Sequence, residues 1–346
     1  MQAHHDYYRG KTILVTGGAG AIGSNLTAAL SQLDAKLVII LDDMSSAVEW
    51  NIPNEKNVMF IRGSVVDEQH LKRVFNLTPD VVFHLAALFA NQKSVDYPEE
   101  DLQVNGLGLL RTLEYAAISK RVQRFVYASS GCAIAACDAP LPLTETSISL
   151  EHSTPYQITK MLGEMYCNYY FHQYGLPVVK PRFFNSFGPG EVPGQYRNVI
   201  PNFIYWALQG KDLVITGNPL ATRDFAWVFD LVDALLKSGY YESVIGQAFN
   251  LSSGKEIEIG YLAKKIIELT GSSSKIVVGS ARKWDVKSRL LADCSKAEEL
   301  IGYCPDIEFE TGLKLTIEWF RQNWDNIVEA ARFNPGVSSA NPGTVK

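Results

Sequence analysis

Short, fully apolar segments alternate with helical segments over the first 180 residues, and this pattern constrains the fold more than any other feature. Strands that are apolar along their whole length are buried on both faces, which indicates a parallel sheet built from right-handed βαβ units. The expected strands are Lys11–Thr16, Leu37–Leu41, Val58–Ile61, Val81–Leu85 and Phe125–Ala128, and the expected helices are Ser24–Leu33, Glu68–Phe75 and Leu107–Lys120.

The alternation breaks after about residue 181 into prolines, aromatic residues and shorter segments. The predicted fold class is α/β, a Rossmann-type doubly wound parallel sheet with a smaller α/β substrate-binding lobe. We expect residues 1–181 to form the sheet domain, with 228–252 returning to it, and residues 182–330 to form the lobe. Residues 331–346 are expected to be a flexible tail.

Composition excludes several classes of function. The formal net charge of −5, without any Lys/Arg run, argues against a nucleic-acid binder. The apolar runs are shorter than the roughly 20 residues of a membrane span, and the N-terminus lacks the pattern of a signal peptide, so a cytoplasmic protein is expected. Five cysteines without a C-x-x-C pair suit reduced thiols, and the six histidines show no ligand spacing, so no metal is expected.

A glycine-rich turn, Gly17 to Gly23, joins the first strand to the first helix. Glycines there let the backbone approach a pyrophosphate that rests on the N-terminus of the helix. Asp42 ends the second strand about 20 residues further on, where a carboxylate binds ribose hydroxyls. The sequence therefore predicts a dinucleotide site, and the carboxylate favours NAD because it would repel the 2′-phosphate of NADP.

Tyr156 and Lys160 lie four residues apart, so on a helix both side chains project from one face. A phenol with a pKa of about 10 needs a drop of roughly three units, or about 4 kcal/mol, to act as a base near neutral pH. An ammonium about 4 Å away supplies an interaction of that size at an effective dielectric constant near 20. Ser129 and Ser130, at the end of the fifth strand, add hydroxyls to this predicted site.

With these motifs in order, the chain resembles the extended short-chain dehydrogenases/reductases, in the NAD-dependent sugar-nucleotide epimerase/dehydratase family that includes UDP-galactose 4-epimerase. The resemblance runs from about residue 11 to about 325. It rests on GGAGAIG at 17–23, LDD at 41–43, HLAAL at 84–88, VNG at 104–106, YASSGC at 127–132, STPYQITK at 153–160, PRFFNSFGPG at 181–190, NVIP at 198–201, TRDFAWV at 222–228, NLSSG at 250–254 and ADCSKAEELIGY at 292–303.

The resemblance implies roles by position. Tyr156 would be the base, Lys160 would lower its pKa and hold the nicotinamide ribose, Ser130 would bond the reacting oxygen, and Asn105 would support the active-site helix. Cofactor contacts would come from Gly17, Gly20, Ala21, Ile22, Gly23, Asp42, Asp43, Ser64, Val65, Leu85, Ala86, Ala87, Asn105, Tyr156, Lys160 and Phe183. Contacts to a nucleotide-diphosphate sugar would come from Ser130, Cys132, Tyr156, Asn185, Asn198, Val199, Arg223, Arg282 and Asp285.

Several positions differ from the UDP-galactose 4-epimerase pattern, among them 133–135, where AIA replaces the usual VYG. Ser64 replaces an acidic residue that faces adenine, Phe89 replaces a lysine near the cofactor, and Thr216 replaces the aromatic residue that stacks on uracil. The position that limits sugar size is either Arg289 or Leu290, because one residue is inserted before it.

Relatives that dehydrate the sugar carry an Asp-Glu pair after the catalytic hydroxyl residue, and decarboxylases carry a glutamate at the second position. Here these positions are Gly131 and Cys132. The leading hypothesis is therefore epimerisation at C4 through a 4-keto sugar. Alternatives are a 3,5-epimerase that uses Cys132, a 4,6-dehydratase or decarboxylase relative, and a non-enzymatic NAD-sensing scaffold. The segment 188–198 contains no lysine to act as the second acid/base of a 3,5-epimerase.

Members of the family commonly form homodimers through two helices of each subunit, and the resemblance implies a homodimer here. The matching segments are 107–120 and 156–174. In the second of these, the candidate contact residues are Met161, Leu162, Met165, Tyr169 and Tyr170.

Overall fold

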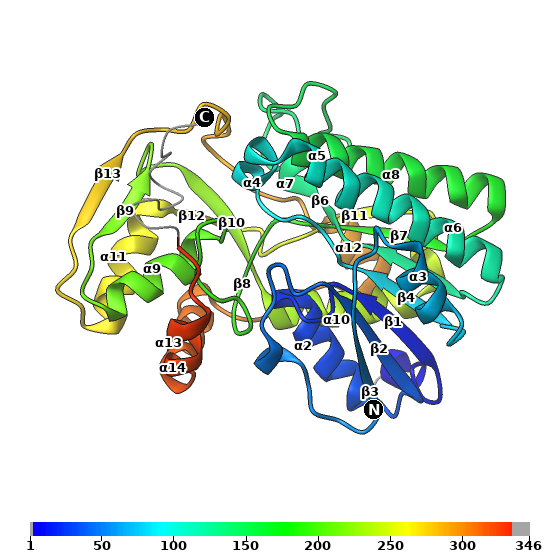
Figure 1. Cartoon of the computed structure of the whole chain (residues 1–346). Coiled ribbons are helices and arrows are strands. Elements are labelled where there is room, and N and C mark those ends of the chain that lie inside the picture. Colours follow the sequence, from blue (N-terminus) through cyan, green and yellow to red (C-terminus); the bar gives the residue numbers. More distant parts are fainter. Residues whose placement is uncertain (1–2, 334–346) are drawn as a thin grey trace.

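The computed structural model describes residues 3–333 and contains one large sheet of parallel strands (Figure 1). Its strand order is β11-β7-β5-β4-β1-β2-β3, and the short β6 (Ser129–Ser130) also pairs with β7. The bounds are β1 (Thr12–Thr16), β2 (Leu37–Asp42), β3 (Val58–Arg62), β4 (Val81–His84), β5 (Arg124–Tyr127), β7 (Val178–Phe183) and β11 (Ala248–Leu251). The five predicted strands are confirmed to within one residue at each end, and so is the α/β fold class.

Helices cover both faces of this sheet because successive apolar residues point to opposite sides. Ile13 and Val15 pack in one core, whereas Leu14 packs in another. The first core is closed by α2 (Ala21–Ser31), α10 (Val228–Tyr240) and α12 (Ser295–Ile301), and the second by α3 (Glu68–Phe75), α6 (Leu109–Ser119) and α8 (Pro155–Tyr174).

Two predicted helices begin at residues other than those expected. α2 starts at Ala21, because Gly20 takes the extended conformation of an N-cap and the glycine-rich turn already ends there. The helix expected from Leu107 is preceded by α5 (Pro98–Asp101) and by the π-helical η2 (Leu102–Gly108), which runs directly into α6.

A second body, on the left in Figure 1, has its own apolar core. Phe203, Leu262, Ile266, Leu313 and Phe320 are all buried in it. Its elements are β8 (Asn185–Phe187), β9 (Leu213–Thr216), β10 (Thr222–Trp227), β12 (Glu256–Glu258), β13 (Ile276–Gly279), α9 (Val199–Leu208), α11 (Ile259–Thr270), α13 (Phe309–Gln322) and α14 (Trp324–Ala330). The predicted domain boundaries stay a prediction. The predicted return of residues 228–252 to the sheet domain is consistent with α10 and β11, which pack in and pair with the large sheet.

Short elements complete the fold: α1 (Ala3–Asp6), η1 (Glu49–Asn51), α4 (Asn91–Asp96), α7 (Gly131–Ile134) and η3 (Glu242–Val244). The predicted tail, residues 331–346, is wrong at its start, because Phe333 packs on Tyr205 and Trp206. The rest of the predicted tail, residues 334–346, lies outside the described residues. Among the helices of residues 3–333, none combines the length and the apolar character that a bilayer crossing demands.

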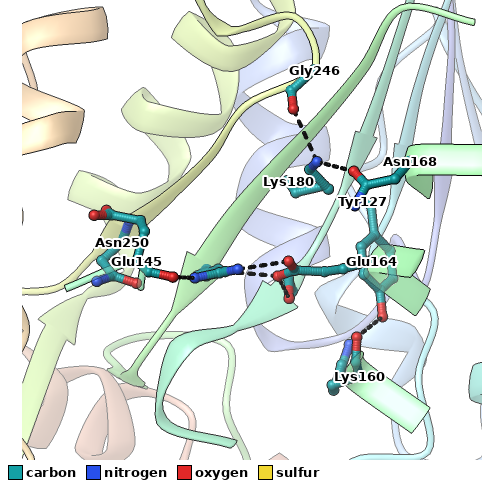
Figure 2. A network of polar contacts seen from close by, with 10 residues as sticks. Tyr127, Glu145, Lys160, Glu164, Asn168, Lys180, Gly246 and Asn250 are labelled. Atoms are coloured by element: carbon teal, nitrogen blue, oxygen red, sulfur yellow. Dashed lines mark hydrogen bonds and ion pairs between the residues drawn. The ribbon is translucent and has the colours of Figure 1, made fainter. Parts of the chain in front are cut away.

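A buried ion pair connects the large sheet to α8 (Figure 2). Arg182 of β7 donates through Nε and Nη2 to the two carboxylate oxygens of Glu164, at 2.8 Å each. Ser129 Oγ donates to the same carboxylate at 2.5 Å, and Arg182 Nη1 donates to the Glu145 carbonyl oxygen at 2.7 Å. The Glu145 carboxylate in turn accepts from the backbone N–H of Asn250 in β11. The network thus joins α8, three strands of the large sheet and the loop after α7.

We expect Arg182→Met to reduce the free energy of unfolding by about 3–5 kcal/mol, because it leaves the Glu164 carboxylate buried without its cation. Equilibrium unfolding in urea measures this change. Arg62→Met is the control, since Arg62 pairs with Glu49 at the surface and its loss costs at most about 1 kcal/mol. A cost for Arg182→Met no larger than that of the control would contradict the structural importance of the pair.

Candidate active site

A cavity of about 580 Å³ lies at the carboxyl ends of the large-sheet strands and extends to the second body. Ligands of doubly wound sheets bind at this edge, where the loops that follow the strands converge. The predicted site residues that line it are Gly17, Gly20, Ala21, Ile22, Gly23, Asp42, Asp43, Ser64, Val65, Leu85, Ala86, Ala87, Ser130, Cys132, Tyr156, Lys160, Phe183, Asn185, Asn198, Val199, Arg223, Arg282 and Asp285.

The glycine-rich turn fits the pyrophosphate of a dinucleotide. Gly17 has φ of +70°, and a Cβ there would lie 2.6 Å from the Ala86 nitrogen. A Cβ on Gly23 would lie 2.1 Å from the Gly17 carbonyl oxygen. Both positions therefore require glycine, and the turn lies directly against the loop after β4 at the N-terminus of α2.

Asp42 is buried at the end of β2, and its carboxylate orients the glycine-rich turn. Oδ2 accepts from the Ala19 N–H at 3.0 Å, and Oδ1 accepts from the Met44 N–H at 2.9 Å. Burial raises the pKa of this carboxyl group, whereas the two backbone bonds lower it. The side chain also lines the cavity, so its remaining lone pairs can accept from ribose hydroxyls.

Ser130, Tyr156 and Lys160 come together on one wall of the cavity. Lys160 Nζ donates to the Ala128 carbonyl oxygen at 2.8 Å and lies 5.6 Å from the centre of the Tyr156 ring. Ser130 Oγ lies 3.4 Å from Cys132 Sγ. The strand end, the short α7 and the first turns of α8 therefore place two hydroxyls, a thiol and an ammonium around the same space.

Burial dominates the titration of this group. It raises the pKa of the Tyr156 phenol above its usual value; Cys132 and Asp101 act in the same direction, and the Ser130 hydroxyl acts against them. Burial also lowers the pKa of the Lys160 ammonium to about 8. The sequence argument that Lys160 lowers the pKa of Tyr156 is thus not sufficient, because desolvation of the phenol outweighs it. Tyr156 needs further positive charge nearby before it can act as a base.

Asn105 was expected to contact the cofactor, but it does not line the cavity. It is buried behind the wall, where Oδ1 accepts from the Leu88 N–H at 2.8 Å and Nδ2 donates to Asp101 at 2.7 Å. Asp101 also accepts from Thr159 Oγ1 at 2.8 Å, one residue before Lys160. Asn105 therefore supports the loop after β4 and α8, as expected from its position, and its contact with the cofactor stays a prediction.

The second body supplies basic and amide groups to the cavity. Arg223 Nη2 pairs with Asp285 at 3.0 Å, and the Arg282 guanidinium lies 5.3 Å from the centre of the Trp284 ring. Asn198 is the N-cap of α9, and Asn198 and Val199 both line the cavity, so the N-terminus of that helix lies at a cavity with cationic walls. Two guanidinium groups and a helix N-terminus form a suitable site for a diphosphate.

The structure distinguishes the two candidates for the residue that limits sugar size. Leu290 is buried and lines the cavity, next to Cys132 in a small apolar cluster. Arg289 is directed away from the cavity and pairs with Glu256. Leu290 therefore occupies the wall position. Phe89 and Thr216, at two of the positions that differ from the family pattern, also line the cavity.

Among the lining residues that the sequence analysis missed, three make notable contacts across the cavity. Trp284 Nε1 donates to Gln92 Oε1 at 2.9 Å, Lys287 Nζ donates to the Cys132 carbonyl oxygen at 2.7 Å, and Arg197 donates to the Ser46 carbonyl oxygen. Each crosses from the second body to the large-sheet body. Sequence spacing carries no signal for such contacts, although Trp284 and Lys287 lie within the same short segment as Arg282 and Asp285.

A family model described as the NAD dependent epimerase/dehydratase family matches residues 13–251. The chain belongs to this family. Its cofactor is NAD, as the glycine-rich turn and Asp42 predicted, and members of the family act as enzymes on sugar nucleotides.

The solved structure of an epimerase from Methanothermobacter thermautotrophicus is 51% identical, with a TM-score of 0.94 over 95% of this chain and 98% of that one. A crystal structure of UDP-glucose 4-epimerase with UDP-glucose from Thermotoga maritima is 34% identical, with a TM-score of 0.86 over 90% and 99%. Among curated proteins, the UDP-N-acetyl-alpha-D-glucosaminuronate decarboxylase of Bacillus cytotoxicus is 34% identical over 90% of this chain and 98% of its own length. The chain is thus an NAD-dependent sugar-nucleotide epimerase, related to enzymes that dehydrate or decarboxylate such sugars.

Proposed function

We propose that the protein interconverts the C4 epimers of a nucleotide-diphosphate sugar. The observation that carries this proposal is that Ser130, Tyr156 and Lys160 line one wall of the cavity. In the sequence, Gly131 and Cys132 come directly after Ser130. Relatives that dehydrate the sugar carry carboxylates at both positions and decarboxylases carry one at the second, whereas here neither residue has a carboxylate. Oxidation of the C4 hydroxyl and its reversal need only the three wall residues and the cofactor.

Each wall residue has a role that fits its position. Tyr156 takes the proton of the C4 hydroxyl, and Ser130 hydrogen-bonds the same oxygen as it becomes a carbonyl. When bound, NAD supplies reversible hydride transfer at C4, and its nicotinamide cation adds the positive charge that the buried phenol requires. Lys160 adds a second cation on the same side. Cys132 and Ala133 keep that wall small, which leaves space for the 4-keto sugar to turn before it is reduced on its other face.

We propose Arg223, Arg282 and the N-terminus of α9 as the diphosphate site, and Leu290 as the wall that limits sugar size. A uridine nucleotide is proposed because the Thermotoga maritima relative was solved with UDP-glucose. We also propose that the enzyme works in the cytoplasm, where its five unpaired thiols stay reduced, and that it supplies sugars for polysaccharide synthesis.

Homodimerisation through α6 and α8 is also proposed. Met161 and Tyr170 are buried in the chain's own core, so they contribute nothing to a partner surface. Met165 and Tyr169 are instead 60% and 48% exposed, and Ile158 is 54% exposed on the same helix. Such large apolar side chains on one helix favour a partner.

Tyr156→Phe should reduce kcat by about 10²–10⁴-fold without loss of folding, since only one hydroxyl that acts as a base is removed. Turnover of UDP-sugars followed by NMR measures the effect. Tyr174→Phe is the matched control, because Tyr174 is exposed at the other end of α8 and its loss should leave kcat unchanged. A Tyr156→Phe enzyme within a few fold of wild type would disprove the proposed chemistry.

The 3,5-epimerase alternative gains one observation from the structure. Lys287 lies beside Cys132, although no lysine occurs in segment 188–198 where the acid partner was sought. Its Nζ also donates to the carbonyl oxygens of Ala133 and Ala135, so the ammonium is held against the same wall as the thiol. An acid and a base on one wall cannot serve opposite faces of a sugar ring, and C4 epimerisation is therefore favoured.

Turnover in D₂O separates these two reactions. C4 epimerisation keeps every carbon-bound hydrogen, so the product should carry no deuterium on carbon, and Cys132→Ser should remain active. Mass spectrometry and NMR of the product measure the incorporation. Deuterium at C3 or C5 that disappears in Cys132→Ser would instead establish the 3,5-epimerase reaction.

Light scattering at micromolar concentration should give twice the 38.4 kDa of one chain. Met165→Glu should shift the protein toward the monomer, because it places a charge in the proposed apolar interface. Met59→Glu, on β3 and away from α8, is the control and should not change the mass. A wild-type mass of one chain would refute the dimer.

A further inference from the structure

The segment 188–198 connects β8 to α9 but lies against the large-sheet body. Asn25 Nδ2 of α2 donates to the Pro189 carbonyl oxygen at 2.9 Å, and Asn51 Nδ2 of η1 donates to that of Gly190 at 2.8 Å. Gly190 has φ of +97°, and a Cβ there would lie 3.0 Å from the Ala21 carbonyl oxygen. The segment therefore reaches the first turn of α2, the helix whose N-terminus faces the pyrophosphate site.

Arg197 is the charged group at the end of this segment. Its guanidinium donates to the carbonyl oxygen of Ser46, in the loop that follows β2, and both residues line the cavity together with Asp42 and Asp43. Arg197 thus lies at the adenosine-ribose end of the dinucleotide site, although it belongs to the segment that leads into the second body.

Two buried carboxylates act on this guanidinium. Glu191 and Asp42 are 5% and 8% exposed, and burial raises the pKa of both carboxyl groups, while the positive charge of Arg197 acts against this rise. Glu191 also accepts from the backbone and side-chain N–H groups of Asn198, which fixes its carboxylate. Two buried carboxylates near this guanidinium favour its position before any ligand arrives, and its five N–H donors exceed the single bond to Ser46.

We propose that Arg197 closes the adenosine end of the NAD site and retains NAD through successive catalytic cycles. The inference rests on the proposed function, because a reaction that returns its hydride to the substrate gains nothing from cofactor exchange. Arg197 comes from segment 188–198, across the cavity from the glycine-rich turn. Its guanidinium can donate to ribose hydroxyls or pyrophosphate oxygens of a dinucleotide bound at the N-terminus of α2. Release of NAD then requires segment 188–198 to move away from the Ser46 loop.

The test measures cofactor release directly, with NADH as a fluorescent probe displaced by excess NAD. Arg197→Met should release NADH about 10- to 100-fold faster than wild type, as expected for loss of hydrogen bonds from a charged group. It should also retain less NAD after desalting. Arg321→Met is the matched control, since Arg321 is an exposed arginine of the second body that likewise donates to one backbone carbonyl, and it should behave as wild type.

Arg197→Met leaves the buried Glu191 carboxylate without a nearby cation, which can unfold the protein. The double variant Glu191→Gln/Arg197→Gln removes both charges, and we expect it to release NADH at the same faster rate. A release rate within twofold of wild type in the folded variant would overturn the proposal. So would a raised KM for the sugar nucleotide with unchanged NADH release, which would assign Arg197 to the substrate. NADH release is measured without sugar turnover, so it tests the role of Arg197 separately from the proposed function. A protein that retains NAD through Arg197 but epimerises no sugar would contradict the proposed function and not the role of Arg197.

Discussion

The buried ion pair of Glu164 and Arg182 is the interaction on which the geometry of the site depends. Glu164 lies one helical turn after Lys160 on α8, and its carboxylate accepts from Ser129, the neighbour of Ser130. A single carboxylate thus connects the helix that carries Tyr156 and Lys160 to the strand end that carries Ser130. Such a pair is stable in a buried position only because several hydrogen bonds compensate the cost of desolvation.

Burial of the catalytic groups has an electrostatic consequence. The same packing that orders Tyr156 and Lys160 raises the pKa of the phenol and lowers that of the ammonium, so each is held toward its neutral form. A base of this kind is weak until another positive charge is nearby. In the proposed mechanism a bound NAD would supply that charge, so proton abstraction by Tyr156 would depend on a loaded cofactor site.

The second body also contacts the large-sheet body directly around the cavity. Trp284, Lys287 and Arg197 each donate to a residue of the large-sheet body, and the three bonds surround the cavity. Trp284 contacts α4, Lys287 contacts the wall next to Ser130, and Arg197 contacts the loop after β2. Ligands in the cavity are therefore enclosed by contacts between the two bodies, which suits a reaction that retains both its cofactor and its keto sugar.

The amino-acid sequence by itself determined the sheet, the glycine-rich turn and the Tyr156–Lys160 pair, because each depends on spacing within one strand or one helix. The sequence also placed Asp42 at the dinucleotide site, because the end of the second strand of a βαβ unit lies next to the glycine-rich turn. Only the tertiary structure decided that Leu290 and not Arg289 lines the cavity, that Asn105 lies behind it, and that Arg197 reaches Ser46. These outcomes depend on how two separately packed cores meet. Residues 151 positions apart come into contact there, and no local periodicity records such a contact.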